Sequence, residues 1–134
     1  WRGAHHSLGD ELLVPSVIYA KALLELRRRV PVHAFVHVTG GGIPGNLVRV
    51  LPPHCHAVVR RGRWEEPRIF AEIQAAGDVS DDEKEQVFNL GVGMLAILPR
   101  GDAHRALDAI RSAGHDAWAI GEVVEGPVGV TLDR

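Results

Sequence analysis

The chain has 134 residues, of which 46% are hydrophobic and 24% are charged, and its net charge at neutral pH is -2. This length and composition fit one folded domain and exclude wholesale disorder. Basic and acidic residues are interspersed, which argues against a nucleic-acid partner. No apolar run reaches the ~18 residues that a membrane span needs, so we expect no membrane partner either.

The single cysteine, Cys55, excludes an internal disulfide and suits a reducing compartment, so we expect a cytoplasmic protein. We expect no signal peptide, because the first ten residues are polar and small. The sequence begins with Trp1 rather than Met, and we interpret it as a fragment or a processed piece.

Residues 1–13 have little periodicity and are expected to form a surface lead-in. Pro15 and Ser16 predict the start of a helix, with Ser16 as its N-cap and Pro31 beyond its end. A strand over residues 33–39 follows and runs into three glycines. In the predicted helix that Ser16 caps, apolar residues recur at the spacing of one helical face: Tyr19, Ala22, Leu23, Leu26 and Val30.

Pro44 predicts the first turn of the next helix, which Pro52 and Pro53 end. A short strand over residues 57–59 comes next, and residues 60–62 close it with a turn.

Pro67 opens a further helix, with Ile69, Phe70 and Ile73 expected to face inward. Gly77 is expected to stop this helix.

Ser80 and Glu83 predict a capping box for a helix that ends near Phe88. The unbroken apolar run over residues 94–98 is typical of a strand covered on both faces.

Asp102 is predicted to cap the next helix, which Gly114 ends. Two final strands, over residues 117–124 and 128–132, are separated by a turn at Gly126 and Pro127. Because strands and helices intermix without a repeat or a linker, we predict a single α+β domain over residues 1–134, with a mixed β-sheet flanked by helices.

The segment His37–Gly42 carries the strongest chemical signal, because a strand leads through glycines into the start of a helix. Glycines let a ligand approach the backbone, and free amides at such a turn attract anions. A phosphate or anion cradle and a tight strand-to-helix turn both fit this spacing. The segment is no Walker A loop, since no Gly-Lys-Ser/Thr follows, and its contiguous glycines do not form a dinucleotide fingerprint.

The segment Phe88–Met94 carries a second signal, with Gly91 and Gly93 two positions apart. Asn89 offers both a donor and an acceptor. A helix stop with glycines needed for packing explains the same pattern.

The triplet His54–His56 has metal-like residues, but alternate residues of a strand point to opposite faces, so we expect no metal site. No Ser-His-Asp or Cys-His arrangement follows from the spacing, and no catalytic residue is assigned.

Together these motifs resemble a known family. His37–Gly42, followed by Asn46 and Arg49 ahead of Val-Leu-Pro52, is similar to the His-x-Thr-Gly-Gly-Gly…Asn-x-x-Arg-Val-Leu-Pro stretch of the phosphoribosylformylglycinamidine cyclo-ligases, or aminoimidazole ribonucleotide synthetases. Phe88–Met94 resembles their Phe-Asn-Met-Gly-x-Gly-Met. The resemblance extends from Leu8 to about Val124.

This resemblance implies the C-terminal α+β domain of a two-domain, homodimeric enzyme of purine biosynthesis. It implies the substrates formylglycinamidine ribonucleotide and ATP, with Mg²⁺, and closure of the imidazole ring to give aminoimidazole ribonucleotide, ADP and phosphate. Most ATP and Mg²⁺ contacts of the family belong to the N-terminal domain, so we expect this chain alone to be inactive. The residues expected to line the substrate are His37, Thr39, Gly40, Gly41, Gly42, Asn46, Asn89, Gly91 and Gly93.

The chain departs from the family at Val17, where the relatives usually have an arginine. Other ATP-using members of the superfamily, such as selenophosphate synthetase, usually have Ser-Asp-Gly-Gly at the glycine turn, which disfavours them. The alternative function is a stand-alone domain that binds a nucleotide or a partner without catalysis.

Overall fold

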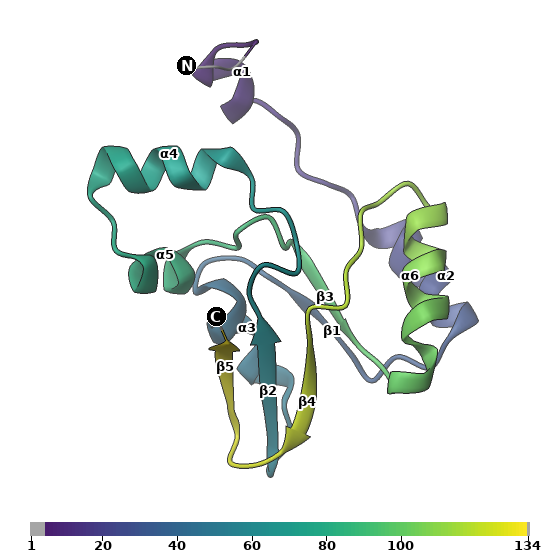
Figure 1. Cartoon of the computed structure of the whole chain (residues 1–134). Helices are drawn as coiled ribbons and strands as arrows, with labels where there is room; N and C mark the ends of the chain where they lie inside the picture. Colours follow the sequence, from purple (N-terminus) through teal and green to yellow (C-terminus); the bar gives the residue numbers. More distant parts are fainter. Residues whose placement is uncertain (1–4, 134) are drawn as a thin grey trace.

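The computed structural model describes residues 5–133, so the part of the predicted lead-in over residues 1–4 lies outside the described residues. Helices and strands intermix along the chain, as predicted (Figure 1). The α-helices are α1 (Leu8–Leu12), α2 (Ala20–Arg29), α3 (Gly42–Leu47), α4 (Arg68–Gly77), α5 (Asp81–Val87) and α6 (Ala103–Ser112). The strands are β1 (Ala34–His37), β2 (Cys55–Arg60), β3 (Met94–Ile97), β4 (Gly121–Glu125) and β5 (Gly129–Asp133), and two 3-10 turns are η1 (Val48–Val50) and η2 (Arg100–Asp102).

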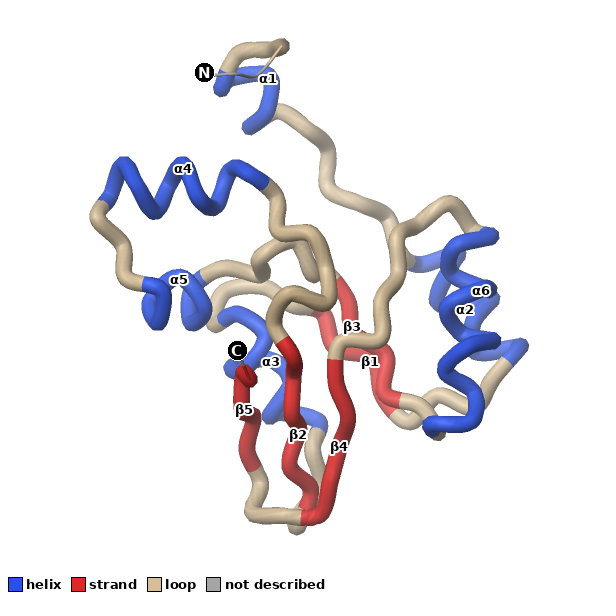
Figure 2. The backbone as a smooth tube through the Cα atoms, in the orientation of Figure 1, coloured by secondary structure: helices blue, strands red, loops and turns tan. Residues whose placement is uncertain are grey.

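The strands form two separate sheets (Figure 2). In the first, β1 and β3 run antiparallel, with Val36 opposite Leu95. In the second, β2 lies between β4 and β5, antiparallel to β4 and parallel to β5. The three-stranded sheet is therefore mixed, and the predicted α+β class is confirmed.

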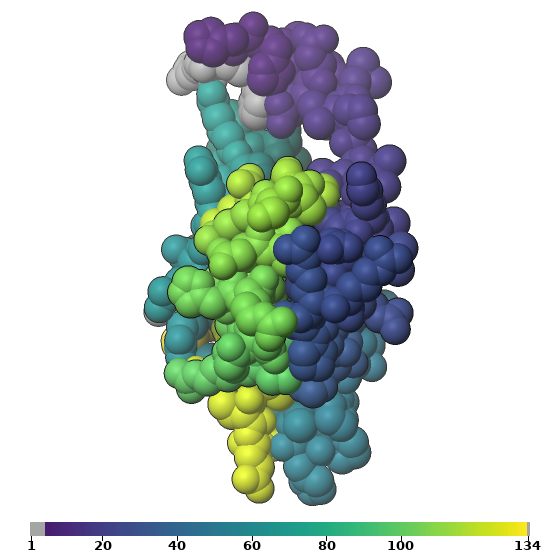
Figure 3. Space-filling view, turned by 90° about the vertical axis from the view of Figure 1, so that its right-hand side faces the viewer, coloured from purple at the N-terminus to yellow at the C-terminus, as the bar shows by residue number. Residues whose placement is uncertain are grey.

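The two-stranded sheet lies between two hydrophobic clusters. Because successive side chains of a strand point to opposite faces, β1 contributes residues to both clusters. Val36 belongs to the larger cluster, together with α3, β2 and the segment 88–92. Phe35 packs against the smaller cluster, where Leu26 of α2 meets Ala106 of α6. Figure 3 shows α2 and α6 side by side over this face of the molecule. The apolar stripe predicted for α2 is confirmed at Leu26, which is 1% exposed.

The segment before α2 differs from the prediction, because the helix begins at Ala20 and Ser16 is not its N-cap. Val17 and Ile18 are exposed and make no core contact that would support a helical turn there. Part of the lead-in is instead helical: Ser7 caps α1, and its hydroxyl accepts from the amide of Asp10 at 3.1 Å.

The prediction of a strand covered on both faces over residues 94–98 holds only in part, because Leu98 packs on the smaller cluster but Ala96 is exposed. Leu95 and Ile97 pack on the larger cluster, whereas Ala96 lies on the opposite face. β3 pairs with β1 alone, so no third strand extends the covered surface beyond it.

Three predicted helix or strand ends also differ from the observed ones. Asp78, rather than Gly77, takes the left-handed conformation that ends α4. Asp102 precedes α6, but its side chain accepts from Arg105 at 3.1 Å and does not cap the helix. Residues 117–120 are outside β4, whose pairing with β2 starts where Gly121 faces Val59. The Ser80 half of the predicted capping box is confirmed, because its hydroxyl accepts from the amide of Glu83 at 3.2 Å and caps α5.

Within residues 5–133, every helix is too short or too polar to traverse a lipid bilayer.

Candidate functional site

The two glycine segments of the sequence converge in the structure, although about fifty residues separate them in the chain. The amide of Val38 donates to the carbonyl of Gly93 at 2.9 Å, directly beyond the pairing of His37 with Met94. On the other side of the turn, Gly42 packs against the carbonyl of Phe88. The predicted ligand segments therefore lie side by side where β1 ends and β3 begins.

The first segment is a tight turn whose middle faces solvent. Gly41 has φ of 94° and Gly42 has φ of 59°, values that glycine adopts without strain. The amide of Gly42 donates back to the carbonyl of Thr39 at 3.1 Å, which closes the turn. Gly40 and Gly41 are exposed, and among residues 5–133 their amides have no hydrogen-bond partner. Two backbone donors of the turn thus remain available to a ligand.

The three glycines serve different purposes. A Cβ on Gly40 would meet no atom within 4 Å, and one on Gly41 would make only ordinary van der Waals contacts. A Cβ on Gly42 would collide with the carbonyl oxygen of Glu85. Gly42 is therefore required for packing against α5, whereas Gly40 and Gly41 leave the backbone open to solvent.

Asn46 holds the turn from the inside and is 4% exposed. Its Nδ2 group donates to the carbonyls of Thr39 at 3.3 Å, Gly40 at 3.2 Å and Gly42 at 2.8 Å. Its Oδ1 accepts from the Thr39 hydroxyl at 3.5 Å. The amide group is thus committed to shaping the turn, and the contact with substrate predicted for Asn46 stays a prediction.

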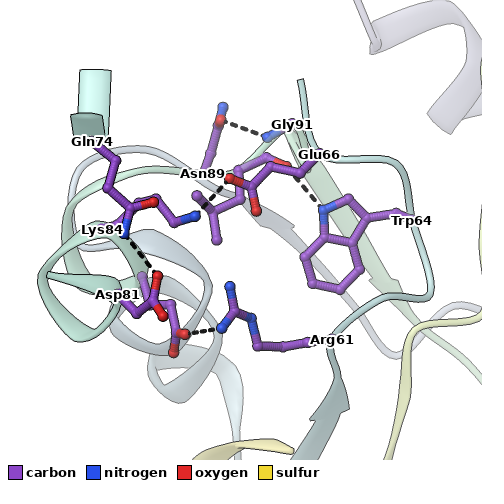
Figure 4. A network of polar contacts seen from close by, with 10 residues as sticks. Arg61, Trp64, Glu66, Gln74, Asp81, Lys84, Asn89 and Gly91 are labelled. Carbon is purple, nitrogen blue, oxygen red and sulfur yellow. Dashed lines mark hydrogen bonds and ion pairs between the residues drawn. The ribbon is translucent and has the colours of Figure 1, made fainter. Parts of the chain in front are cut away.

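The second segment is shaped by its neighbours. Asn89 Oδ1 accepts from the amide of Gly91 at 3.0 Å, and the carbonyl of Leu90 accepts from the indole of Trp64 at 2.9 Å (Figure 4). A Cβ on Gly91 would strike Pro67. The alternative explanation of these glycines as packing residues thus has a specific physical cause, and their role as a second ligand wall stays a prediction.

The segment borders a surface pocket of about 350 Å³. Its lining includes Gly91, Pro67, Trp118 and Asp116. The sequence predicted a strand over residues 117–124 and did not place Trp118 or Asp116 beside this segment.

Two partly buried ion pairs hold the helix that packs against Gly42. Lys84, whose side chain is 8% exposed, donates to Glu66 at 2.9 Å, and the neighbouring Glu85 pairs with Arg61 (Figure 4). Both partners lie in the turn that follows β2. These pairs hold α5 against residues 61–66. Because Gly42 packs against α5, they also support the glycine turn.

Among residues 5–133, no three His, Cys, Asp or Glu side chains gather as a metal-binding group. His56 of the metal-like triplet uses both ring nitrogens within the fold, at 3.0 Å from the carbonyl of Pro127 and 2.8 Å from the hydroxyl of Thr131. His37 is exposed at the end of β1, beside the turn.

Sequence comparison gives the same family from residues 1–133, which match the model of the "AIR synthase related protein, C-terminal domain". A phosphoribosylformylglycinamidine cyclo-ligase of Anaeromyxobacter dehalogenans is 44% identical over 123 residues, covering 92% of this chain and 36% of the relative. The enzymes of the same name from Anaeromyxobacter sp. and Nitrosococcus oceani are 45% and 42% identical, over 90% of this chain and 35% and 34% of theirs. The chain thus spans about a third of the length of these relatives. On this match, the chain belongs to the family of AIR synthase related C-terminal domains.

Proposed function

We propose that this chain forms one wall of the nucleotide site of a phosphoribosylformylglycinamidine cyclo-ligase. The reaction closes the imidazole ring of formylglycinamidine ribonucleotide and converts ATP to ADP and phosphate. The observation that carries the proposal is the exposed turn at Gly40 and Gly41, with two backbone amides that have no partner among the described residues. The relatives named above are named for this activity, and this chain aligns with about a third of their length.

The chain's own contribution is to bind and orient. Backbone amides that point at an anionic oxygen stabilise it without moving, because the folded turn already holds them in place. Asn46 keeps the turn in this shape through three carbonyl contacts. Since α3 has only six residues, the amides of the turn carry the argument rather than the dipole of the helix.

ATP with Mg²⁺ would supply the phosphoryl group that activates the formyl oxygen and the positive charge that this transfer needs. As the resemblance to the cyclo-ligases implies, the Mg²⁺ contacts would come mainly from other parts of the longer enzyme. A cytoplasmic homodimer that contains this domain is part of the same proposal.

A chimera tests the function. In the Anaeromyxobacter dehalogenans relative, the aligned segment is replaced by this chain, and formation of aminoimidazole ribonucleotide is measured. We expect ATP-dependent turnover from the chimera and none from the 134-residue chain alone. A chimera that folds and binds ATP but gives no product would favour the alternative, a binding domain without catalysis.

The Gly41→Val variant of the chimera addresses the site itself. We expect turnover to fall about 100-fold, because a branched side chain blocks the approach of ligand to the turn. Gly62→Val is the matched control, since Gly62 also has a positive φ, of 74°, and open space around it, but lies in the turn after β2. Equal turnover of the two variants would contradict the assignment.

A further inference from the structure

Six of the thirteen large hydrophobic residues that are exposed within residues 5–133 lie close together in the chain before α2. They are Leu8, Leu12, Leu13, Val14, Val17 and Ile18. Residues 12–18, which we call the apolar segment, carry no charged side chain. The segment joins α2 to α1, which stands apart from both sheets (Figure 1). Single apolar residues are normal on a protein surface, but an exposed uncharged run of this length is typical of an interaction surface.

The backbone of the apolar segment also lacks partners. Residues 14–19 belong to no helix or strand, and among residues 5–133 the amides of residues 16–18 have no hydrogen-bond partner. Side-chain packing starts only at Tyr19, whose ring lies 6.0 Å from that of His115 between centroids. A chain with free amides and apolar side chains can bind a second surface through both.

The relatives indicate which surface is available. The family model that this chain matches is a C-terminal domain, and about two thirds of each named relative lies outside the aligned part. A C-terminal domain follows the rest of its chain, so the unaligned part precedes the aligned one, on the side where the apolar segment lies. Because both parts belong to one polypeptide, the effective concentration of the preceding part at the segment is high, which favours it over a second copy.

We propose that the apolar segment is a docking surface for the preceding part of the longer cyclo-ligase, which receives Leu13 and Ile18 in an apolar groove. The inference rests on the proposed function, because it takes this chain to be part of such an enzyme. Leu13 and Ile18 are each 80% exposed here, so docking removes much apolar surface from water. The free amides of residues 16–18 gain acceptors in the same contact.

The test compares the apolar segment in the 134-residue chain with the same segment in the chimera described above. Hydrogen exchange is followed by mass spectrometry, and thermal denaturation gives the Tm. We expect the amides of residues 16–18 to exchange about 100-fold more slowly in the chimera, because docking gives them partners.

Leu13→Gln and Ile18→Gln remove the apolar contacts. In the chimera, each should make the exchange of residues 16–18 about tenfold faster and lower the Tm. In the 134-residue chain, each should leave the Tm unchanged, because both side chains are already in solvent. Leu24→Gln is the matched control, since Leu24 is 58% exposed but lies on α2, where leucine and glutamine have similar helix propensities. It should change neither quantity in either protein.

The outcomes separate docking from the proposed function. Equal exchange of residues 16–18 in the chain and the chimera would overturn the docking, whether or not the chimera is active. A chimera that protects the segment but forms no aminoimidazole ribonucleotide would overturn the proposed function and leave the docking in place. A 134-residue chain that sediments as a dimer, and as a monomer in Ile18→Gln, would overturn the proposal by identifying a second copy as the occupant. An equal effect of Leu24→Gln and Ile18→Gln in the chimera would also contradict a specific contact.

Discussion

The carbonyl oxygen of Glu85 lies over the α-carbon of Gly42 so closely that no side chain fits between them. One is a residue of α5 and the other begins α3, and the contact fixes the distance between the two helices. The partly buried ion pairs of Lys84 and Glu85 hold α5 in this place. The shape of the glycine turn thus depends on a helix that does not itself reach the exposed surface of the turn.

Gly42→Ala should lower the free energy of unfolding by about 3 kcal/mol, because the new methyl group meets a backbone carbonyl and φ is positive. Gly40→Ala is the matched substitution and should stay within about 0.5 kcal/mol, since nothing lies within 4 Å of its Cβ. Urea denaturation measures both. Similar values for the two variants would contradict the packing role of Gly42.

Asn46→Leu should lower the free energy of unfolding by about 2–4 kcal/mol. The apolar side chain leaves the carbonyls of the turn without their common donor in a buried position. Hydrogen exchange of the Gly42 amide, which closes the turn, should also become faster in this variant. An unchanged exchange rate would mean that the backbone holds the turn without Asn46.

The Lys84–Glu66 pair should behave as a unit. Glu66→Leu alone leaves the ammonium of Lys84, 8% exposed, without its carboxylate and should cost about 2 kcal/mol of stability, since Glu66 is 28% exposed and solvent screens part of the pair. The double variant Glu66→Leu/Lys84→Met should recover most of this loss, because well-packed apolar residues often replace a buried pair without cost. Thermal denaturation of the single and double variants checks the recovery. Neutralising the exposed pair Arg68–Glu72 should change stability by under about 1 kcal/mol.

The pKa of Glu25 should depend on the charge of Arg29. The hydrogen bond from Arg29, at 2.9 Å, lowers the pKa of Glu25 below its usual value. The stabilisation from this pair is therefore present above the unfolded pKa and is lost as the pH falls through the lower, folded pKa. Arg29→Gln should raise the pKa of Glu25 in a carboxyl NMR titration, whereas Arg27→Gln should leave it in place.

The sequence predicted the parts of the fold that depend on local patterns. The stripe that buries Leu26, the strand that becomes β1 and the Ser80 cap all follow from spacing within one element. The predicted start of α2 was wrong. Ser16 is a residue that often caps a helix, but the exposed Val17 and Ile18 beside it have no core contacts that would support a helical turn. Such support depends on neighbours that are distant in sequence.

The candidate site shows the same division. The sequence identified both glycine segments, but their convergence depends on the register of β1 and β3, which no local pattern states. A side chain at Gly91 would collide with Pro67, and one at Gly93 would collide with Tyr19. Both neighbours belong to distant parts of the chain. Asn46 was expected to line the substrate because of the family resemblance, but no sequence pattern indicated that its side-chain amide holds the carbonyls of the turn.

The central strand β2 has a consequence for how the molecule assembles. Both of its neighbours, β4 and β5, come from the last part of the chain, where Ala57 finally meets Val123 on one side and Val130 on the other. On the ribosome, β2 thus emerges long before either edge can be paired, and its folding must wait for the C-terminal residues. A ribosome-bound chain that ends before Gly121 leaves both edges of β2 without their native partner strands.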